Sequence, residues 1–357
     1  MIMLEAAEKF SYSGTPVECR IFGNGHINRS FLVKTDAGKR YVLQSLSTLA
    51  FHDIPGLMNN AIAVSSYIRN KTGDPRSSLR FVPAADGKYY FLDGNGEYWR
   101  SYEFVEDTFS PDAPGTIEDF YNSAVAFGTF QNLLSDFPAD TLCETIPDFH
   151  NTPDRYRKFH EKINADPLGR VKEVADEIGF ALEREEDAGK LQKMRESGEL
   201  PLRVSHNDTK LTNVLFDSKT GKPVCVIDLD TVMPGLSALD FGDAIRFGAS
   251  TGAEDEKDLS KVCIDLDKFA AFVKGFIRSC PALTDTEIRS LALGAKTITL
   301  EQGVRFLDDY INGDVYYATS YPGQNLDRAR TQFRLVSEME KHWDEMQGII
   351  NQTLREL

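Results

Sequence analysis

Residues 204–247 constrain the fold of this chain more than any other stretch, because they set charged and amide side chains between two apolar runs. The stretch reads VSHNDTKLTNVLFDSKTGKPVCVIDLDTVMPGLSALDFGDAIRF. Residues 214–216 and 224–227 have the composition of β-strands around a Ser-Lys-Thr-Gly turn, which predicts a hairpin. Strand alternation then places Asp228 and Asp230 on one face, as two carboxylates at a strand end.

Asp208 is followed five residues later by Asn213, a spacing typical of a phosphoryl-transfer loop. In such a loop the aspartate accepts a hydroxyl proton and the asparagine binds Mg²⁺. Isolated Asp and Asn residues in loops are far more often turn formers or caps. Here His206, the predicted hairpin and Asp228 follow in the right order, which favours the catalytic interpretation. The stretch therefore predicts the metal-binding end of a kinase.

The composition is that of an acidic globular protein. With 357 residues, 40 Lys+Arg and 55 Asp+Glu, the formal net charge is −15, which argues against nonspecific binding to nucleic acid or to an anionic membrane. ATP can still bind, since its site needs only local cations and Mg²⁺. Five cysteines without close pairing suggest neither a zinc cluster nor a disulfide framework. This cysteine pattern favours a reducing cytoplasm, and the N-terminus is too short and too acidic for a signal peptide. We expect a cytoplasmic protein, and we also expect a monomer.

The first hundred residues are rich in predicted strands. The turn containing Gly23, Gly25 and His26 lies between two strands, which disfavours a dinucleotide-binding fingerprint. A glycine-containing hairpin can bring backbone N–H groups close to phosphates, although many such turns simply join strands. An apolar stripe predicts a helix over 57–67. We place a lobe boundary after residue 104, so that residues 1–104 form a nucleotide-binding lobe.

Residues 105–357 are predicted to form a catalytic and substrate-binding lobe made mainly of helices, whose apolar stripes are expected in the core. Residues 284–287 resemble a capping box, and the chain from residue 324 onward predicts one charged amphipathic helix. The charged run 158–198 is predicted to be solvated helix. Together the two lobes predict an α+β, bilobal protein-kinase-like fold with a small β-rich N-terminal lobe.

Two segments, VSHNDTKLTNVLFD and VIDLDTVMPGLSALDFGDAIRFGAS, are similar to the aminoglycoside phosphotransferase/choline kinase superfamily. Within it, the chain resembles the N-acetylhexosamine 1-kinases through FGNGHIN near the start and EQGVRFLDDYINGDVYYAT near the end. This resemblance covers nearly the whole chain. It implies Mg²⁺- and ATP-dependent phosphorylation of N-acetylglucosamine or N-acetylgalactosamine at the C1 hydroxyl, giving the sugar 1-phosphate.

The resemblance also assigns roles to residues. It makes Asp208 the catalytic base and Asn213 and Asp228 the Mg²⁺ ligands, while Asp230 either assists the metal or orients the loop. The expected nucleotide contacts are Gly23, Gly25, Gln44, Asn213 and Asp228. The candidate sugar contacts, whose donors and aromatic faces suit a pyranose, are His26, Asp208, Thr209, Phe247, Arg305 and Tyr316.

Several polar residues near this motif have a structural interpretation as well. We interpret His206 as a hydrogen-bonded brace of the loop, and Asp240 and Asp243 as caps of the next helix. Arg305 lies within an apolar helical segment, where a purely structural arginine would need a partner such as Asp308 or Asp309.

The small lobe departs from the usual kinase pattern. A strand lysine normally pairs with the nucleotide phosphates and is held by a helix glutamate. Here the strand presents Gln44, and the predicted helix has no acidic residue between positions 57 and 64. Because an amide can donate a hydrogen bond but cannot neutralise a phosphate, we expect Lys210 to steady the transferred γ-phosphoryl group.

Two other functions stay open. A small-molecule kinase of the choline/ethanolamine or homoserine type would keep the same loop, but would surround an ammonium group with acidic and aromatic side chains. A non-catalytic nucleotide-binding module is suggested by the missing lysine and disfavoured by the intact Asp208, Asn213 and Asp228.

Overall fold

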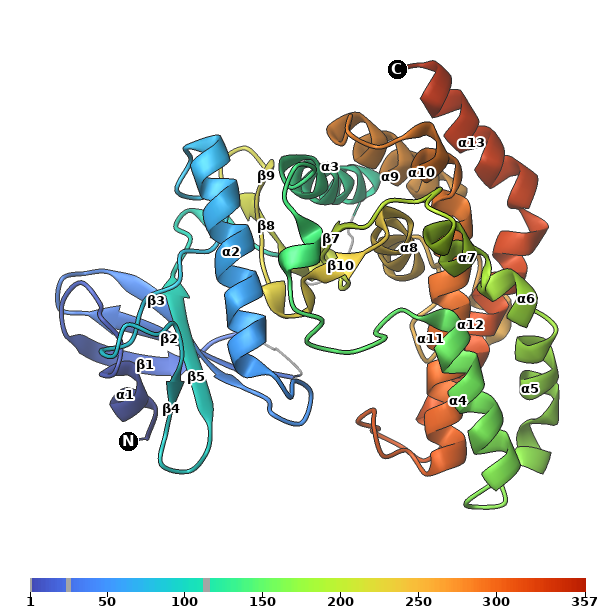
Figure 1. The fold of residues 1–357 in the computed structure, drawn as a ribbon, viewed down its shortest axis with the longest axis horizontal. Coiled ribbons are helices and arrows are strands. Elements are labelled where there is room, and N and C mark those ends of the chain that lie inside the picture. Colours follow the sequence, from blue (N-terminus) through green and yellow to red (C-terminus); the bar gives the residue numbers. More distant parts are fainter. Residues whose placement is uncertain (1, 24–26, 112–115) are drawn as a thin grey trace. The chain divides into compact units, whose positions relative to one another are not determined.

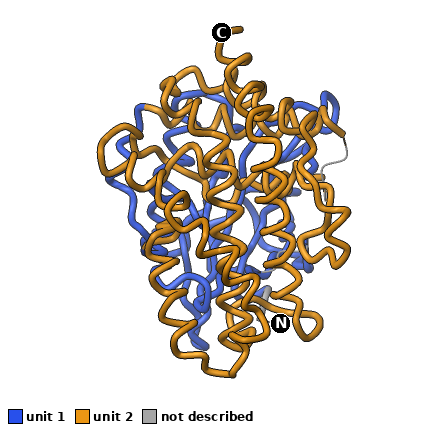
Figure 2. The backbone as a smooth tube through the Cα atoms, turned by 90° about the vertical axis from the view of Figure 1, so that its right-hand side faces the viewer, with its two compact units in different colours: residues 1–110, 136–147, 214–234 blue, residues 111–135, 148–213, 235–357 orange. Residues whose placement is uncertain are grey.

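The computed structural model of the protein describes residues 2–23, 27–111 and 116–357. They form two compact units (Figure 2). The first unit contains residues 1–110, 136–147 and 214–234, and the second unit contains residues 111–135, 148–213 and 235–357. The chain therefore passes several times between the units, and the lobe boundary after residue 104 stays a prediction.

The first unit is built on a five-stranded antiparallel sheet in the order β1-β2-β3-β5-β4 (Figure 1). Its strands are β1 Pro16–Ile21, β2 Arg29–Thr35, β3 Arg40–Leu46, β4 Phe91–Leu92 and β5 Tyr98–Glu103. The turns β2–β3 and β4–β5 contain Gly38 and Gly96, whose φ angles of +74° and +83° favour glycine.

Different helices lie on the two faces of this sheet. The short helix α1 (Ile2–Ala7) and the turn after it pack against a face that carries Phe31, Leu43 and Trp99. The longer helix α2 (Ile54–Thr72) brings the Met58 sulfur to 4.0 Å from the Arg100 guanidinium on the other face. The predicted helix over 57–67 is thus confirmed and extends further at both ends.

A second, three-stranded sheet in the first unit has the order β6-β8-β9. The strands β6 (Thr108–Phe109), β8 (Val214–Asp217) and β9 (Pro223–Val226) confirm the predicted hairpin. The predicted alternation of Asp228 and Asp230 is wrong, however. Asp228 adopts a left-handed backbone with φ +60°, and a 3₁₀ turn, Leu229–Thr231, follows directly. The pleat therefore ends before either carboxylate.

The second unit is mainly helical. The long helix α11 (Leu291–Asn312) packs against α4, α8 and α12. The other helices are α3 Ile117–Leu133, α4 Thr152–Ala165, α5 Ala175–Leu182, α6 Glu185–Ala188, α7 Lys190–Glu196, α8 Ser237–Gly248, α9 Leu266–Ser279, α10 Asp285–Arg289, α12 Gln324–Lys341 and α13 Trp343–Arg355. The short strand β7 (Arg203–Ser205) also lies in this unit, whereas Met233 and Pro234 of the short strand β10 (Met233–Gly235) belong to the first unit. The single helix predicted from residue 324 is two helices, because the first helix ends before His342 and the second begins after it.

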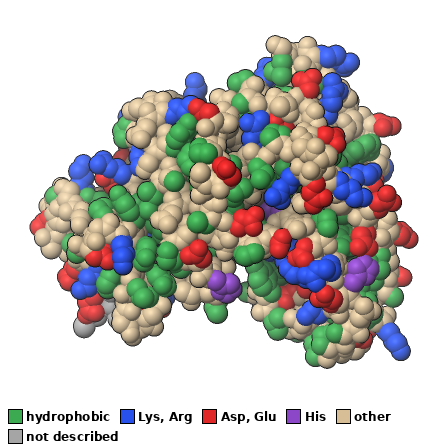
Figure 3. Space-filling view, viewed as in Figure 1, with side chains coloured by type: hydrophobic (Ala, Val, Ile, Leu, Met, Phe, Trp, Pro, Cys, Tyr) green, Lys and Arg blue, Asp and Glu red, His purple; other side chains and the backbone are tan. Residues whose placement is uncertain are grey.

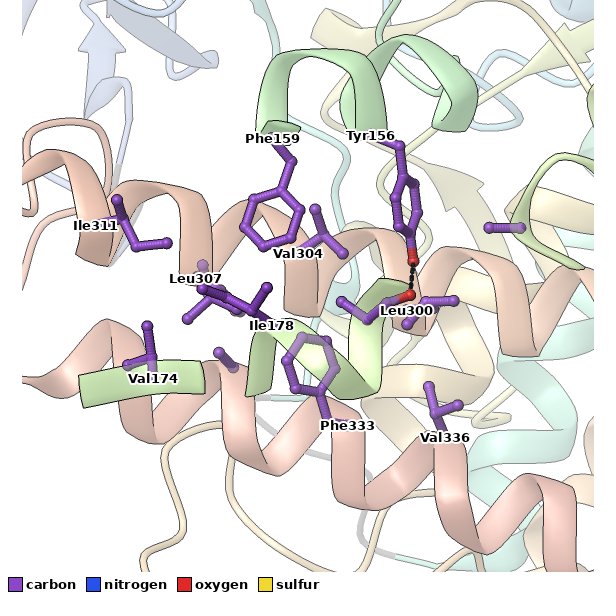
Figure 4. Packing of buried hydrophobic residues seen from close by; sticks show 14 residues of the cluster. Tyr156, Phe159, Val174, Ile178, Leu300, Val304, Leu307, Ile311, Phe333 and Val336 are labelled. Carbon is purple, nitrogen blue, oxygen red and sulfur yellow. Dashed lines mark hydrogen bonds between the residues drawn. The ribbon is translucent and has the colours of Figure 1, made fainter. Parts of the chain in front are cut away.

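The charged run 158–198 is not only a solvated surface, so that prediction is wrong in part. Phe159, Ile178 and Ala181 are buried with residues of α11 and α12 in one apolar cluster (Figure 4). The Tyr156 hydroxyl donates a 2.9 Å hydrogen bond to the Ala181 carbonyl within it. On the face seen in Figure 3, acidic and basic side chains are interspersed over the helical part. The segment is thus amphipathic. Its high density of charged residues hid the apolar face from the sequence analysis.

The fold is α+β, with a β-sheet N-terminal region followed by mainly helices, as the sequence predicted. No helix within the described residues combines the length and the apolar character needed to cross a bilayer.

Helix α8 is held tightly in the second unit. Its Phe241 ring meets the rings of Phe269 and Phe276 of α9 edge to face at 5.9 and 5.6 Å. Its Gly242 packs directly against Gly294 of α11. A Cβ atom added at Gly242 would overlap the backbone atoms of Gly294. The close approach therefore fixes the position of α8, which carries the side chains described below.

We predict that Gly294→Ala lowers the free energy of unfolding by about 1–3 kcal/mol, because its Cβ would overlap the Ala238 carbonyl. Gly348→Ala is the matched control. That glycine lies in α13 with open space around its Cβ position, so alanine should stabilise the helix by about 0.5–1 kcal/mol. Urea unfolding would measure both, and equal shifts in the two variants would contradict the close packing.

Candidate active site

Residues 206–213, the candidate catalytic loop, follow β7 and end in a 3₁₀ turn, Leu211–Asn213. Two buried carboxylates of α8 hold the loop backbone. Asp240 accepts the N–H groups of His206 and Asn207 at 2.8 and 2.7 Å. Asp243 accepts that of Thr209 at 3.0 Å.

The prediction that Asp240 and Asp243 cap the next helix is therefore wrong. Helix α8 already begins at Ser237, and both aspartates lie inside it. Their side chains point away from the helix's own amides and satisfy those of the loop. The sequence could not separate these roles, because both use an aspartate next to unpaired N–H groups.

His206 is fully buried, with its ring edge-on to Phe127 and Phe130 at centroid distances of 5.5 and 5.9 Å. Its Nδ1 atom accepts the Asp208 N–H at 3.3 Å, which corresponds to the tautomer protonated on Nε2. Both features support the interpretation of His206 as a brace of the loop.

The Asp208 carboxylate has two partners within the loop. Lys210 Nζ lies 2.8 Å from Oδ1, and Asn213 Nδ2 donates to Oδ2 at 3.0 Å. The same Nδ2 also donates to the Asp208 carbonyl at 2.9 Å. The amide nitrogen of Asn213 is thus turned toward Asp208, so Oδ1 is the amide atom that can serve a cation. With its side chain 26% exposed, Asp208 is oriented yet reachable.

Lys210 stays cationic at neutral pH. Burial alone would lower the pKa of its ammonium group, but the Asp208 carboxylate raises it above the ordinary value. The ammonium lies 5.0 Å from the centroid of the Phe247 ring, and the Arg246 guanidinium lies 3.9 Å from it. Asp243 accepts a 2.9 Å hydrogen bond from Arg246, so a row of alternating charges follows α8 beside the loop.

Arg305 of α11 has no carboxylate within ion-pair distance in the described part of the chain. Its Nη1 donates to the Gln302 side chain at 3.1 Å, and its guanidinium lies 5.4 and 5.7 Å from the Phe149 and Tyr317 ring centroids. Of the two expected structural partners, neither Asp308 nor Asp309 forms an ion pair with it, and Asp309 instead accepts the backbone N–H of Tyr316 at 2.9 Å. Arg305 is half-buried, and its hydrogen bond to Gln302 uses only one of the five N–H donors of a guanidinium group.

Tyr316 itself is 66% exposed and lies close enough to Arg305 to interact with it. Asp309 also accepts the N–H groups of Val315 and Tyr317 and the side-chain amide of Asn325. A buried carboxylate thus anchors the segment that carries Tyr316 to the end of α11.

The sequence analysis missed a buried polar cluster beside Arg305. Glu301 accepts a 2.6 Å hydrogen bond from Thr152, and its other oxygen lies 2.9 Å from His150 Nδ1. Burial alone would raise the pKa of Glu301, but His150 and Thr152 lower it below the ordinary value. His150 in turn interacts electrostatically with Asp243. The one available signal was an acidic residue inside an otherwise apolar helical run.

The remaining predicted residues lie in the first unit or outside the described residues. Gly23 has φ +74° with open space at its Cβ position, while Gly25 and His26 lie outside the described residues. Gln44 donates to the Ser30 hydroxyl, and Asp228 follows β9. Their nucleotide and metal contacts stay predictions.

A β-sheet N-terminal region combined with a helical remainder is the protein-kinase-like architecture of small-molecule phosphotransferases. Residues 18–261 match the model of the phosphotransferase enzyme family. The chain belongs to that family, which confirms the resemblance at this level.

Solved structures share the fold. A microcompartment-associated aminopropanol kinase has a TM-score of 0.67 at 17% identity, covering 97% of this chain and 98% of that chain. An aminoglycoside phosphotransferase from Alicyclobacillus acidocaldarius has a TM-score of 0.63 at 15% identity, covering 100% and 97%. A choline kinase from Cryptosporidium parvum has a TM-score of 0.56 at 13% identity, covering 93% and 91%. At these identities the likeness establishes the fold alone.

A buried ion pair anchors the strand that leads into the loop. Arg203 of β7 donates to both carboxylate oxygens of Glu287 at 2.9 and 2.8 Å. Glu287 also closes the predicted capping box with Thr284, which is confirmed. Burial alone would raise the pKa of Glu287, but the hydrogen bonds from Arg203 and Thr284 lower it below the ordinary value.

We predict that Arg203→Met lowers the free energy of unfolding at pH 7 by about 3 kcal/mol, because it leaves a buried carboxylate without its cation. The folded-state pKa of Glu287 is depressed, so the Arg203–Glu287 pair stabilises the fold at pH values above the ordinary glutamate pKa of about 4.3. This contribution is lost as the pH falls through the folded-state pKa of Glu287. The difference between variant and parent should therefore shrink below about pH 4.

Arg278→Met is the matched control, since the Arg278–Glu356 pair is at the surface, with both side chains more than 40% exposed. Its cost should be within about 1 kcal/mol. A pH-independent difference for Arg203→Met would contradict the assigned role of Glu287.

Proposed function

We propose that the protein is an ATP-dependent kinase that phosphorylates N-acetylhexosamines at the C1 hydroxyl to give the sugar 1-phosphate. Its phosphotransferase family membership supports the reaction class. The observation that carries the sugar assignment is Arg305. It is a half-buried arginine that forms no ion pair among the described residues, interacts with the Glu301 carboxylate only electrostatically, and lies near the aromatic rings of Phe149 and Tyr317. Such a site offers donors to hydroxyl or acetamide oxygens and apolar faces to a pyranose.

In this proposal Asp208 orients the sugar hydroxyl and takes its proton, and Lys210 steadies the transferred phosphoryl group. An anomeric hydroxyl is more acidic than an ordinary alcohol, so a carboxylate is a sufficient base. The hydrogen bond from Asn213 and the ion pair with Lys210 fix the Asp208 carboxylate before substrate arrives. Most of the rate then comes from positioning and charge neutralisation.

Asn213 and Asp228 are the proposed Mg²⁺ ligands. Carboxylate and amide oxygens suit this hard cation, and the Asn213 amide nitrogen is already committed to Asp208, which presents Oδ1. When bound, Mg²⁺ neutralises charge on the nucleotide phosphates. The backbone around Gly23 and Gly25 and the Gln44 side chain are proposed to contact the nucleotide.

The proposed sugar contacts are Thr209, Phe247, Arg305 and Tyr316, with His26 from outside the described residues. An amino-alcohol substrate, as in the aminopropanol and choline kinases of the same fold, fits less well. Its ammonium group would meet the Arg305 cation, and both oxygens of the nearby Glu301 carboxylate are already occupied by His150 and Thr152.

The test is a Mg²⁺/ATP assay over N-acetylglucosamine, N-acetylgalactosamine, glucose, galactose, choline and 3-aminopropanol, with ³¹P NMR of the product. We expect a sugar 1-phosphate, formed fastest from the N-acetylated sugars. Asp208→Asn should reduce turnover by about 100-fold or more while ATP binding is retained. Turnover of the amino alcohols alone would overturn the sugar assignment, and nucleotide binding without any turnover would favour a non-catalytic module.

A separate variant tests the role of Lys210. Lys210→Ala should lower kcat by about 100-fold, as expected when one preorganised donor to a transition state is removed. Lys219→Ala, in the exposed β8–β9 turn, is the control and should leave kcat unchanged. A kcat for Lys210→Ala within a few-fold of the parent would remove Lys210 from the chemistry.

A further inference from the structure

A row of polar side chains crosses the sheet of the first unit on the face toward α2. Ser30, Gln44 and Arg100 occupy directly opposed positions on β2, β3 and β5. Gln44 Nε2 donates to Ser30 Oγ at 2.9 Å, and Gln44 Oε1 accepts from Arg100 Nε at 2.9 Å. The amide thus joins its two neighbours, and the row ends in the guanidinium group of Arg100.

The row continues to Asp230. Arg100 Nη1 forms an ion pair with Asp230 Oδ1, and Asn28 Nδ2 donates to Oδ2 at 2.6 Å. Arg100 and Asp230 are 1% and 3% exposed. Both oxygens of Asp230 are therefore occupied by protein donors, which favours its role in orienting the loop over that of a metal ligand.

The segment held in this way, residues 228–232, is here called the metal loop. It opens on Asp228, whose left-handed backbone at φ +60° is uncommon for a residue with a side chain. A strained backbone persists where surrounding contacts over-determine it. At the other end of the loop, buried Asn60 of α2 donates to the Val232 carbonyl at 3.0 Å.

The sheet and α2 thus hold the metal loop at two points, Asp230 and Val232. Arg100 also interacts electrostatically with Asp228, so one buried guanidinium group attracts both carboxylates of the metal loop.

We propose that Arg100 is a positioning residue for phosphoryl transfer: it locks Asp230 so that Asp228 presents its carboxylate to the metal ion. The inference rests on the proposed function for the identity of the metal site, and not on which acceptor is phosphorylated. Arg100 does not contact the nucleotide itself, since its side chain is buried and its Nε and Nη1 atoms are bonded to Gln44 and Asp230.

The test measures Mn²⁺ binding in the presence of ADP by EPR at 15 °C, together with the thermal midpoint and the Mg²⁺ dependence of kcat. Arg100→Gln should weaken Mn²⁺ binding by about 10–100-fold, the usual effect of removing a partner that orients a metal ligand. High Mg²⁺ should restore part of kcat, and the KM of the acceptor should stay unchanged. Arg80→Gln, which removes the exposed Arg80–Glu103 pair nearby, is the matched control and should change none of these.

A lower thermal midpoint of Arg100→Gln with unchanged Mn²⁺ affinity would overturn the proposal, because a merely structural role predicts that result. If Arg100→Gln does not fold, Asn28→Ala keeps the Arg100–Asp230 pair and removes the amide donor to Asp230 Oδ2. It should then give a smaller loss of Mn²⁺ affinity, and unchanged affinity would overturn the proposal. Since the EPR measurement contains no acceptor, failure of the sugar assignment would leave this test valid.

Discussion

The candidate catalytic loop depends on two buried carboxylates of α8. Asp240 and Asp243 of α8 take the N–H groups of His206, Asn207 and Thr209, none of which lies in regular secondary structure. Because a buried N–H group without an acceptor is costly, the loop can be buried at its base and still expose Asp208. The close packing of α8 against α9 and α11 then transmits the rigidity of the helical unit to the loop.

Local signals carried much of the sequence prediction. The hairpin around residues 218–221, the capping box at Thr284 and the apolar face of α9 all depend on neighbours in sequence, and all are confirmed. The spacing of Asp208, Asn213 and Asp228 predicted a phosphoryl-transfer site, and the phosphotransferase family, indicated by the resemblance of the two segments around these residues, is confirmed by the family match. The individual roles of these residues in binding metal and substrate stay predictions.

Two of the failures share a physical cause, which is pairing between residues far apart in the sequence. The left-handed turn at Asp228 ends a strand pattern that looked continuous in the sequence. Next to this turn, Asp230 pairs with Arg100, which lies 130 residues earlier in the chain. Glu301 was overlooked because its partners, His150 and Thr152, lie about 150 residues earlier in the chain. The charged run 158–198 hid an apolar stripe because its helices are short and irregular.

The polar row on the sheet also bears on how the chain finds its fold. Ser30, Gln44 and Arg100 meet only in one strand register. A slip by one residue would turn a polar side chain to the face of Phe31 and Trp99 and leave the arginine charge buried without an acceptor. A wrongly paired sheet is thus less stable than the correct one. The residues that hold the metal loop therefore also favour the correct alignment of three strands.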